Sequence, residues 1–259
     1  MTALSVGLSV DWLALREPAD AEARSVPLLD ALPPGGPLVV HDLGSGTGSM
    51  LRWLAPRLPG PQRWTLHDRL PGLLDVARRT TTVDSSGTPV EVCVREGDIT
   101  ALTPADLAGC LVTSSALLDM LTTDELGILV AACAGAGCPV LWTLCVVGRI
   151  SFVPADARDH AHETAFNAHQ RRDGRLGPSA SAVAARLFRQ HGYTVTVRPS
   201  PWRLGAADRA LAEEWLRGWV GAAVEHDPSL AGDYLAYRLA SPFEAVVGHE
   251  DILALPPTA

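Results

Sequence analysis

An aspartate followed at once by a glycine-rich turn is the part of this sequence best suited to bind a ligand. The apolar residues 38–40 are followed by His41 and Asp42, and Gly44, Ser45 and Gly46 come directly after Leu43. A turn of this kind between a buried strand and a helix is the usual place for a nucleotide-like ligand in an open α/β sheet. Glycine has no Cβ, so Gly44 and Gly46 can take positive φ and let a ligand lie against the backbone. The carboxylate of Asp42 would repel a pyrophosphate but attract an ammonium or sulfonium group, so the pattern predicts a ligand with cationic centres.

A second aspartate ends the next predicted strand. Residues 64–68 form that strand in our interpretation, and Asp68 is its last residue. Because a right-handed βαβ unit places the ends of the two strands side by side, Asp68 should lie next to the glycine turn. Its carboxylate could there accept hydrogen bonds from both hydroxyl groups of a ribose.

The position of the third glycine separates two ligand families. A dinucleotide fold requires Gly-x-Gly-x-x-Gly or Ala, with the helix N-terminus facing a pyrophosphate. In this chain Gly48 comes one residue early, and Ser49 holds the dinucleotide position. Together with Asp42, this spacing disfavours an NAD(P)-dependent oxidoreductase, which stays open as an alternative. The stretch resembles motif I of class I S-adenosylmethionine (SAM) dependent methyltransferases.

The resemblance implies further residues that contact SAM. In this family the acid after the third strand accepts a hydrogen bond from the adenine amino group and the next residue contacts the ring, which points to Asp98 and Ile99. An arginine on a leading helix can meet the SAM carboxylate, and Arg24 is the candidate, with a solvent-exposed helix face as the open alternative. Ser114 and Ser115 end the fourth predicted strand, which faces the ligand crevice, so they should border the methyl group. The complete predicted set is Arg24, Asp42, Gly44, Ser45, Gly46, Asp68, Arg69, Asp98, Ile99, Ser114 and Ser115.

Two histidines are the candidate catalytic residues. If residues 155–172 are helical, His162 and His169 share one face, because seven residues make nearly two turns. In the resembling family a helix at this point overlies the acceptor pocket, and a histidine with a pKa of about 6.5 could take a proton from an acceptor hydroxyl. Two alternatives stay open: the histidines only shape the pocket, or the helix faces solvent. No metal site is predicted, because the segment lacks an acidic ligand triad.

The elements that must position these residues alternate between apolar strands and amphipathic helices. Predicted strands lie at 38–43, 64–68, 90–95, 110–115, 140–147, 193–197 and 244–253. With the family resemblance, this order predicts an α/β fold, a Rossmann-like seven-stranded, mostly parallel sheet with helices on both faces. The fold would carry an N-terminal helical cap and a helical insertion before the last strand.

The chain should form a single domain, 1–259. Its predicted parts are an N-terminal helical cap (1–37), a SAM-binding core (38–147), an acceptor-side segment (148–177) and a C-terminal part with the helical insertion (178–259). Residues 10–32 of the cap read as helical, with Pro18 and Pro27 dividing them into short pieces. A turn-rich linker, 33–37, leads into the first strand.

The insertion, 200–243, repeats large apolar residues at helical spacing. These are Leu211, Trp215, Leu216, Trp219 and Val220. Packing against the sheet is the favoured interpretation, and a lid or a homodimer surface is the alternative. The stretch 214–218 and the elements after it are loosely similar to the trans-aconitate and malonyl-carrier methyltransferase group, which esterifies carboxylates.

The composition and charge of the chain limit the kinds of partner and the cellular location that we expect for it. The formal net charge of -8 argues against a nucleic-acid surface, because phosphate binding needs clustered cations. The uncharged stretch 126–147 is long enough to span a bilayer, but its glycines and Pro139 favour a helix, a turn and a buried strand. No basic region precedes the apolar residues of 1–14, so no signal peptide is expected. Five cysteines without a CxxC pair fit a reducing cytoplasm.

The sequence therefore predicts a cytoplasmic SAM-dependent methyltransferase that acts on a small molecule. The expected reaction is direct in-line transfer, most simply to oxygen, that rests on positioning and desolvation. A SAM-binding protein that does not methylate, or that regulates, is an alternative, because the motifs describe only the cofactor. A protein or RNA methyltransferase is disfavoured by the acidic charge.

Overall fold

The protein, described here by a computed structural model over residues 9–32 and 38–257, is organised around one large sheet. Its strands are β1 (Leu38–Leu43), β2 (Gln62–Asp68), β3 (Glu91–Glu96), β4 (Cys110–Ser115), β5 (Val140–Val153), β6 (Thr194–Pro199), β7 (Trp202–Leu204) and β8 (Glu244–Leu255). The longer helices are α1 (Val10–Ala23), α4 (Thr123–Ala136), α5 (Asp159–Gln170), α6 (Ala180–Gln190) and α7 (Arg209–His226). Three shorter helices are α2 (Ser49–Leu54), α3 (Pro71–Ala77) and α8 (Tyr234–Leu239).

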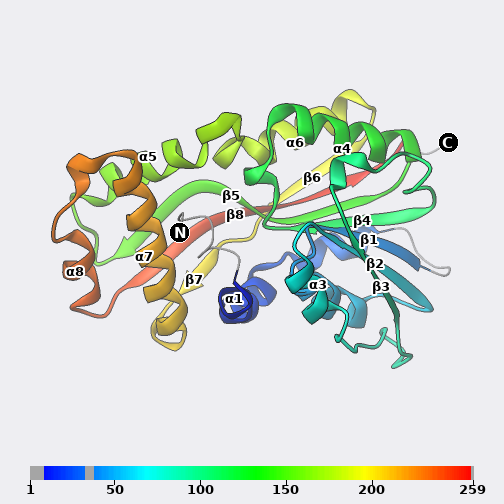
Figure 1. Cartoon of the computed structure of the whole chain (residues 1–259), viewed down its shortest axis with the longest axis horizontal. Helices are drawn as coiled ribbons and strands as arrows, with labels where there is room; N and C mark the ends of the chain where they lie inside the picture. Colours follow the sequence, from blue (N-terminus) through cyan, green and yellow to red (C-terminus); the bar gives the residue numbers. More distant parts are fainter. Residues whose placement is uncertain (1–8, 33–37, 258–259) are drawn as a thin grey trace.

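The strand order is β3-β2-β1-β4-β5-β8-β6, and β7 also pairs with β8. The five strands from β3 to β5 run parallel, whereas β8 is antiparallel to β5, β6 and β7. In Figure 1, α4 and α6 lie above the sheet, and α1 and α3 lie below it. The predicted fold class is confirmed, including the helical insertion before the last strand, with eight strands in place of the expected seven.

Two apolar layers cover the two faces of the parallel strands. One contains Leu126, Trp142 and Phe188, from α4, β5 and α6, all at most 1% exposed. The other contains Leu51 and Trp64, which are fully buried. The strands that carry the predicted binding residues are therefore held from both sides, which fixes the positions of their carboxyl ends.

The N-terminal helix is longer than the sequence suggested. Pro18 lies inside α1, and the helix nevertheless continues to Ala23. Proline removes one donor, but its φ is compatible with helical geometry, and α1 also packs on the rest of the protein. The expected break at Pro27 is present, since a separate 3-10 helix spans Val26–Ala31. The predicted linker, 33–37, and the first eight residues lie outside the described parts.

The fifth strand is also longer than expected. It was predicted to end near 147 but continues to Val153, pairing with β8 through two register shifts. This extension and β8 carry α5, α7, α8 and β7, which form the left side of Figure 1. We call these elements, with their own apolar core, the helical lobe. The three residues of β7 gave too short a pattern to be recognised as a strand.

The uncharged stretch 126–147 is divided between α4 and β5, as predicted. Within residues 9–32 and 38–257, every helix is too short or too polar to span a bilayer.

Candidate functional site

A cavity of about 320 Å³ lies at the carboxyl ends of the parallel strands. Its walls come from α1, the glycine turn, the loops after β2 and β3, the segment after β4, and a single residue of the segment between α5 and α6. The lining residues are Leu13, Arg16, Asp20, Asp42, Gly44, Ser45, Gly46, Thr47, Ser49, Met50, Asp68, Arg69, Leu70, Leu73, Gly97, Ile99, Ser115, Ala116, Leu117, Met120, Leu121, Glu125 and Arg175.

The glycine turn has the backbone conformation that its sequence requires. Gly44 and Gly46 have φ values of 64° and 54°. A Cβ at Gly44 would lie 2.9 Å from the Cδ1 atom of Leu117, so a side chain there would be both strained and crowded. The backbone N–H of Ser45 donates to the carbonyl of His67 at 2.8 Å, which joins the turn to the end of β2.

Asp42 is a buried carboxylate with one oxygen left without a partner. Its Oδ1 accepts a hydrogen bond from the Thr113 hydroxyl at 2.8 Å, whereas Oδ2 has no partner among the described residues. Burial raises the pKa of Asp42 to about 6, against the hydrogen bond from Thr113 and the charge of Arg24. Leaving a buried acceptor unsatisfied costs about 1–3 kcal/mol, so this atom indicates a donor supplied by a ligand.

Asp68 holds the glycine turn in place and also lines the cavity. Its Oδ2 accepts from the backbone N–H of Gly46, and its Oδ1 from that of Leu70, both at 2.9 Å. Because each carboxylate oxygen has two lone pairs, acceptor capacity remains on the side that faces the cavity.

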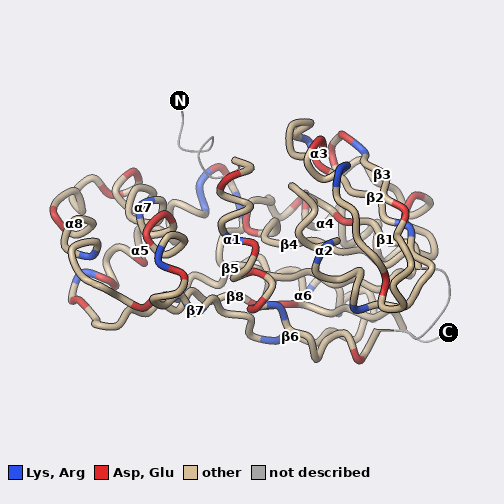
Figure 2. Tube along the Cα trace, turned by 90° about the horizontal axis from the view of Figure 1, so that it is seen from below, with Lys and Arg blue, Asp and Glu red and all other residues tan. Residues whose placement is uncertain are grey.

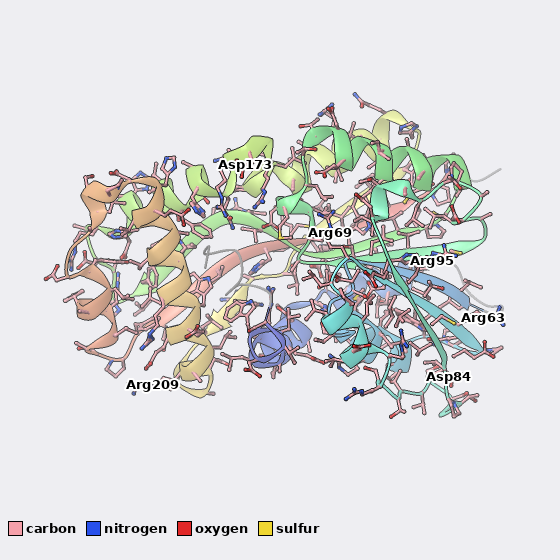
Figure 3. The ribbon with its side chains drawn as sticks, in the orientation of Figure 1. Arg63, Arg69, Asp84, Arg95, Asp173 and Arg209 are labelled. Atoms are coloured by element: carbon pink, nitrogen blue, oxygen red, sulfur yellow. The ribbon has the colours of Figure 1, made fainter. Side chains whose placement is uncertain are left out.

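The predicted adenine-binding residues divide between the wall and the rim of the cavity. Ile99 is 6% exposed and lines it. Asp98 does not line it, but caps the short 3-10 helix Ile99–Ala101 by accepting from the Thr100 N–H at 2.9 Å, which lowers its pKa. Arg69, labelled in Figure 3, lines the cavity. Its side chain lies 3.9 Å from that of Asp98, and both are largely exposed.

Arg24 and Ser114 lie behind the cavity wall. The Arg24 guanidinium, 2% exposed, donates to the hydroxyls of Ser49 and Ser115 at 2.8 and 3.0 Å. Burial lowers its pKa. The Ser114 hydroxyl donates to the Leu43 carbonyl at 2.8 Å. Of the two serines, only Ser115 lines the cavity.

The two candidate catalytic histidines lie in the helical lobe, and neither lines the cavity. The ring of His162 stacks on Tyr234 with 3.9 Å between centroids, and its Nδ1 lies 3.0 Å from the Arg158 carbonyl. The Nε2 of His169 lies 3.4 Å from a carboxylate oxygen of Glu225, and burial lowers its pKa. Both are buried on the side of α5 that packs on α7 and α8. The described residues hold no cluster of three or more metal-ligating side chains.

Sequence reasoning missed the part of the cavity formed by α1 and by the segment after β4. Arg16 and Asp20 of α1 line it as a bidentate pair, with N–O distances of 2.9 and 3.1 Å. Because residues four positions apart lie on the same face of a helix, the sequence could have predicted an ion pair between Arg16 and Asp20. Arg175 gave no such signal, because it lies between two helices and reaches the cavity only through the tertiary fold.

Figure 2 shows acidic and basic residues interspersed along the chain, including around α1 and α3 near the cavity. The cavity itself is lined by side chains of both charges, among them Arg16, Asp42 and Asp68.

Comparisons with known proteins also point to a methyltransferase domain. Residues 40–136 match the family model of a methyltransferase domain. No curated protein matches the chain.

Solved structures share the fold at low sequence identity. The cyclopropane synthase MmaA2 from Mycobacterium tuberculosis is 13% identical, with a TM-score of 0.52 over 96% of this chain and 95% of that one. A SAM-dependent methyltransferase from Methanosarcina mazei is 9% identical, with a TM-score of 0.51 over 91% and 99%. The chain spans about half of a Haemonchus contortus N-methyltransferase, covering 51% of it at 14% identity and a TM-score of 0.46.

The match over residues 40–136 supports the predicted methyltransferase core, and the predicted fold is shared with the two solved structures from Mycobacterium tuberculosis and Methanosarcina mazei. The comparisons do not confirm the predicted likeness to the trans-aconitate group.

Proposed function

We propose that this chain, whose core is a class I SAM-dependent methyltransferase domain, methylates an oxygen atom of a small molecule. The observation that carries the proposal is the buried Oδ2 of Asp42, which lacks a partner among the described residues and belongs to a residue of the cavity wall. A positively charged amino group is the kind of donor that would satisfy it. Asp68 and the open glycine turn stand beside it.

The residues of the cavity fit the parts of SAM. Asp42 and the turn at Gly44 would hold the amino-acid end, Asp68 the ribose hydroxyls, and Ile99 with Asp98 the adenine. Ser115 would lie near the methyl group, with Arg24 behind it fixing its hydroxyl. When bound, SAM supplies the methyl group on a sulfonium centre.

The chain itself contributes alignment and exclusion of water. Apolar side chains of Leu13, Leu117, Met120 and Leu121 form one side of the cavity. Holding two reactants in line within such a wall can account for up to ~7–11 kcal/mol of a barrier. A phenolate or carboxylate acceptor needs no base from the protein, which agrees with the absence of both predicted histidines from the wall.

The size of the cavity supports a small acceptor. About 320 Å³ is at the lower end of the range for small-molecule sites, and α1 forms one of its walls. A macromolecular acceptor would require a cavity open enough for a polymer chain to enter. Transfer to oxygen is proposed because a phenolate or carboxylate oxygen accepts a methyl group without losing a proton to the protein, and neither His162 nor His169 lines the cavity.

The test is transfer of an isotopically labelled methyl group. Purified protein is incubated with SAM labelled by carbon-13 in the methyl group and with a small-molecule extract, and products are identified by mass spectrometry. We expect a product that has gained one labelled methyl, whose carbon chemical shift is that of a methoxy group or methyl ester. SAM binding without any labelled product would favour the regulatory alternative, and a shift typical of methyl on nitrogen or carbon would contradict the proposed atom.

A further inference from the structure

Three arginines line the cavity, and they differ in what neutralises them. Arg16 is paired with Asp20 through two hydrogen bonds. Arg69 faces Asp98 at the exposed rim. Arg175 has no carboxylate oxygen within 4.0 Å and no side-chain hydrogen bond among the residues that the structure places. Of the three, Arg175 therefore offers an uncommitted guanidinium to a bound molecule.

The backbone around Arg175 is fixed beside the segment that follows β4. Arg175 forms an isolated antiparallel bridge with Thr122, and the N–H of Leu176 donates to the carbonyl of Leu121 at 2.8 Å. Figure 3 labels Asp173, two residues earlier, on the connection between α5 and α6. These two backbone contacts fix the position of Arg175 in the cavity wall. Its side chain is half-buried.

Neither of the two neighbouring acids forms an ion pair with the guanidinium of Arg175. Glu125 also lines the cavity, but its Oε2 accepts from the N–H and the hydroxyl of Thr122 at 2.8 and 3.0 Å, in the capping box that starts α4. Asp119 interacts with Arg175 only at longer range: burial raises the pKa of Asp119 to about 6, while Arg16 and Arg175 oppose that rise. A guanidinium in such a setting is suited to a bidentate carboxylate or phosphate.

The surroundings of Arg175 are otherwise apolar. Leu117, Met120 and Leu121 lie on the same side of the cavity, and Met120 is 37% exposed. The acids that match the cationic and hydroxyl groups of SAM, Asp42 and Asp68, come instead from the strand ends. Arg175 and these apolar side chains therefore add to the cavity wall a chemistry that differs from that of the two acids.

We propose that Arg175 binds an anionic group, a carboxylate or a phosphate, on a methyl acceptor that has an apolar body. This inference rests on the proposed function, because it assigns the acceptor of that same site. Arg175 is in this account a specificity-determining residue, and it takes no part in holding SAM.

The experiment separates acceptors by charge. A small-molecule extract is divided on a strong anion exchanger into retained and unretained fractions, and each is incubated with methyl-labelled SAM. The proteins are the wild type, Arg175→Gln, Arg175→Lys and the control Arg209→Gln. Arg209 pairs with Glu213 on α7, and Figure 3 labels it at the lower left of the view, below Asp173. Phosphatase treatment of the retained fraction distinguishes a phosphate monoester from a carboxylate.

We expect labelled product from the retained fraction only. Arg175→Gln should lower kcat/KM by about ten- to a hundredfold, mainly through KM, because a hydrogen-bonded charge pair is lost. Arg175→Lys should restore part of the loss, and Arg209→Gln should match the wild type. The affinity for S-adenosylhomocysteine, measured by calorimetry, should be the same in all four proteins, which also shows that the variants are folded.

Three results would overturn the inference alone: product from the unretained fraction, unchanged kcat/KM in Arg175→Gln, or weaker S-adenosylhomocysteine binding in that variant. The last would assign Arg175 to the carboxylate of the cofactor. No labelled product from either fraction, with SAM bound, would instead contradict the proposed function, and the inference would fall with it.

Discussion

The acids of the cavity and the acids of the helical lobe differ in how completely they are paired. Asp42 has a buried oxygen without a partner among the described residues, and it lines the same cavity as Ala116, which has a φ of 52°. In the lobe, Asp159 accepts from both Arg238 and Tyr234. A buried carboxylate oxygen can stay unpaired in a cavity wall, where a ligand can supply its donor, whereas Asp159 holds elements of the lobe together.

The comparison explains why the two histidines are placed as they are. His162 and His169 share one face of α5, as predicted, but that face packs on α7 and α8. The same residue types at the same spacing serve packing here, because the lobe stands on the extended ends of β5 and β8, away from the parallel strands. Residue type and spacing therefore do not suffice to predict the role of a side chain, because the role also depends on what the side chain contacts.

The largest effect on stability should come from breaking the buried pair of the lobe. Arg238 has a side chain that is 2% exposed and donates to Asp159 and to the carbonyl of Pro154. Arg238→Met should lower the free energy of unfolding by about 3 kcal/mol, because Asp159 loses its counter-charge in a partly buried site. Chemical denaturation measures the change. The matched control, Arg209→Gln, removes an exposed helix pair and should cost about 0.5 kcal/mol or less.

The affinity of the Arg238→Met variant for SAM should be compared with its loss of stability. Arg238→Met should bind SAM as the wild type does at temperatures where it is folded. A loss of affinity comparable to the loss of stability would show that the two regions are not independent.

The next largest effect should be on SAM affinity at the cavity. Asp68→Ala removes the acceptor for the ribose and also frees the N–H groups of Gly46 and Leu70. Binding should weaken by about 1–3 kcal/mol, measured by calorimetry. Asp98→Ala, at the rim, should cost less, because its carboxylate is exposed and already bonded to Thr100. Equal losses in the two variants would contradict the division between wall and rim.

SAM affinity should also depend on pH through Asp42. The pKa of this carboxyl is raised to about 6 by burial, so below that pH the proton competes with the cationic ligand. Affinity should be constant above about pH 7 and fall by about fourfold between pH 7 and pH 5.5, as the ionised fraction of a carboxyl with this pKa falls. Measurements should stay above about pH 5.5, because burial lowers the pKa of His67 to about 4 and the unfolded state gains protons as pH falls below about 6.5.

The control for this pH profile is Asp42→Asn. It should bind SAM more weakly at pH 7.5 and lose the change near pH 6. The same pH profile in wild type and variant would assign the titration to another group.

The smallest effect should follow replacement of His162. His162→Phe keeps the stacking on Tyr234, so turnover and SAM affinity should stay within about twofold of the wild type, with a stability change of about 1 kcal/mol. A large fall in kcat with unchanged stability would return His162 to a catalytic role.

The cofactor side of the site could be predicted because it depends on local patterns. Apolar runs that end in Asp42 and Asp68, with a glycine turn between them, specify strand ends that a parallel sheet must bring together. The helices of the lobe could be predicted from their apolar spacing, but their position could not, because β5 and β8 extend each other only by pairing between residues about a hundred apart in the sequence. Arg175 depends on a bridge to Thr122 that no local spacing encodes.

Calorimetric titration of the protein with SAM and with S-adenosylhomocysteine at pH 7.5 tests the central claim most directly. We expect one molecule of either ligand to bind each chain, more weakly to Asp42→Asn and Asp68→Ala. The absence of any heat with both ligands, in protein shown to be folded, would contradict the assignment of the cavity to SAM.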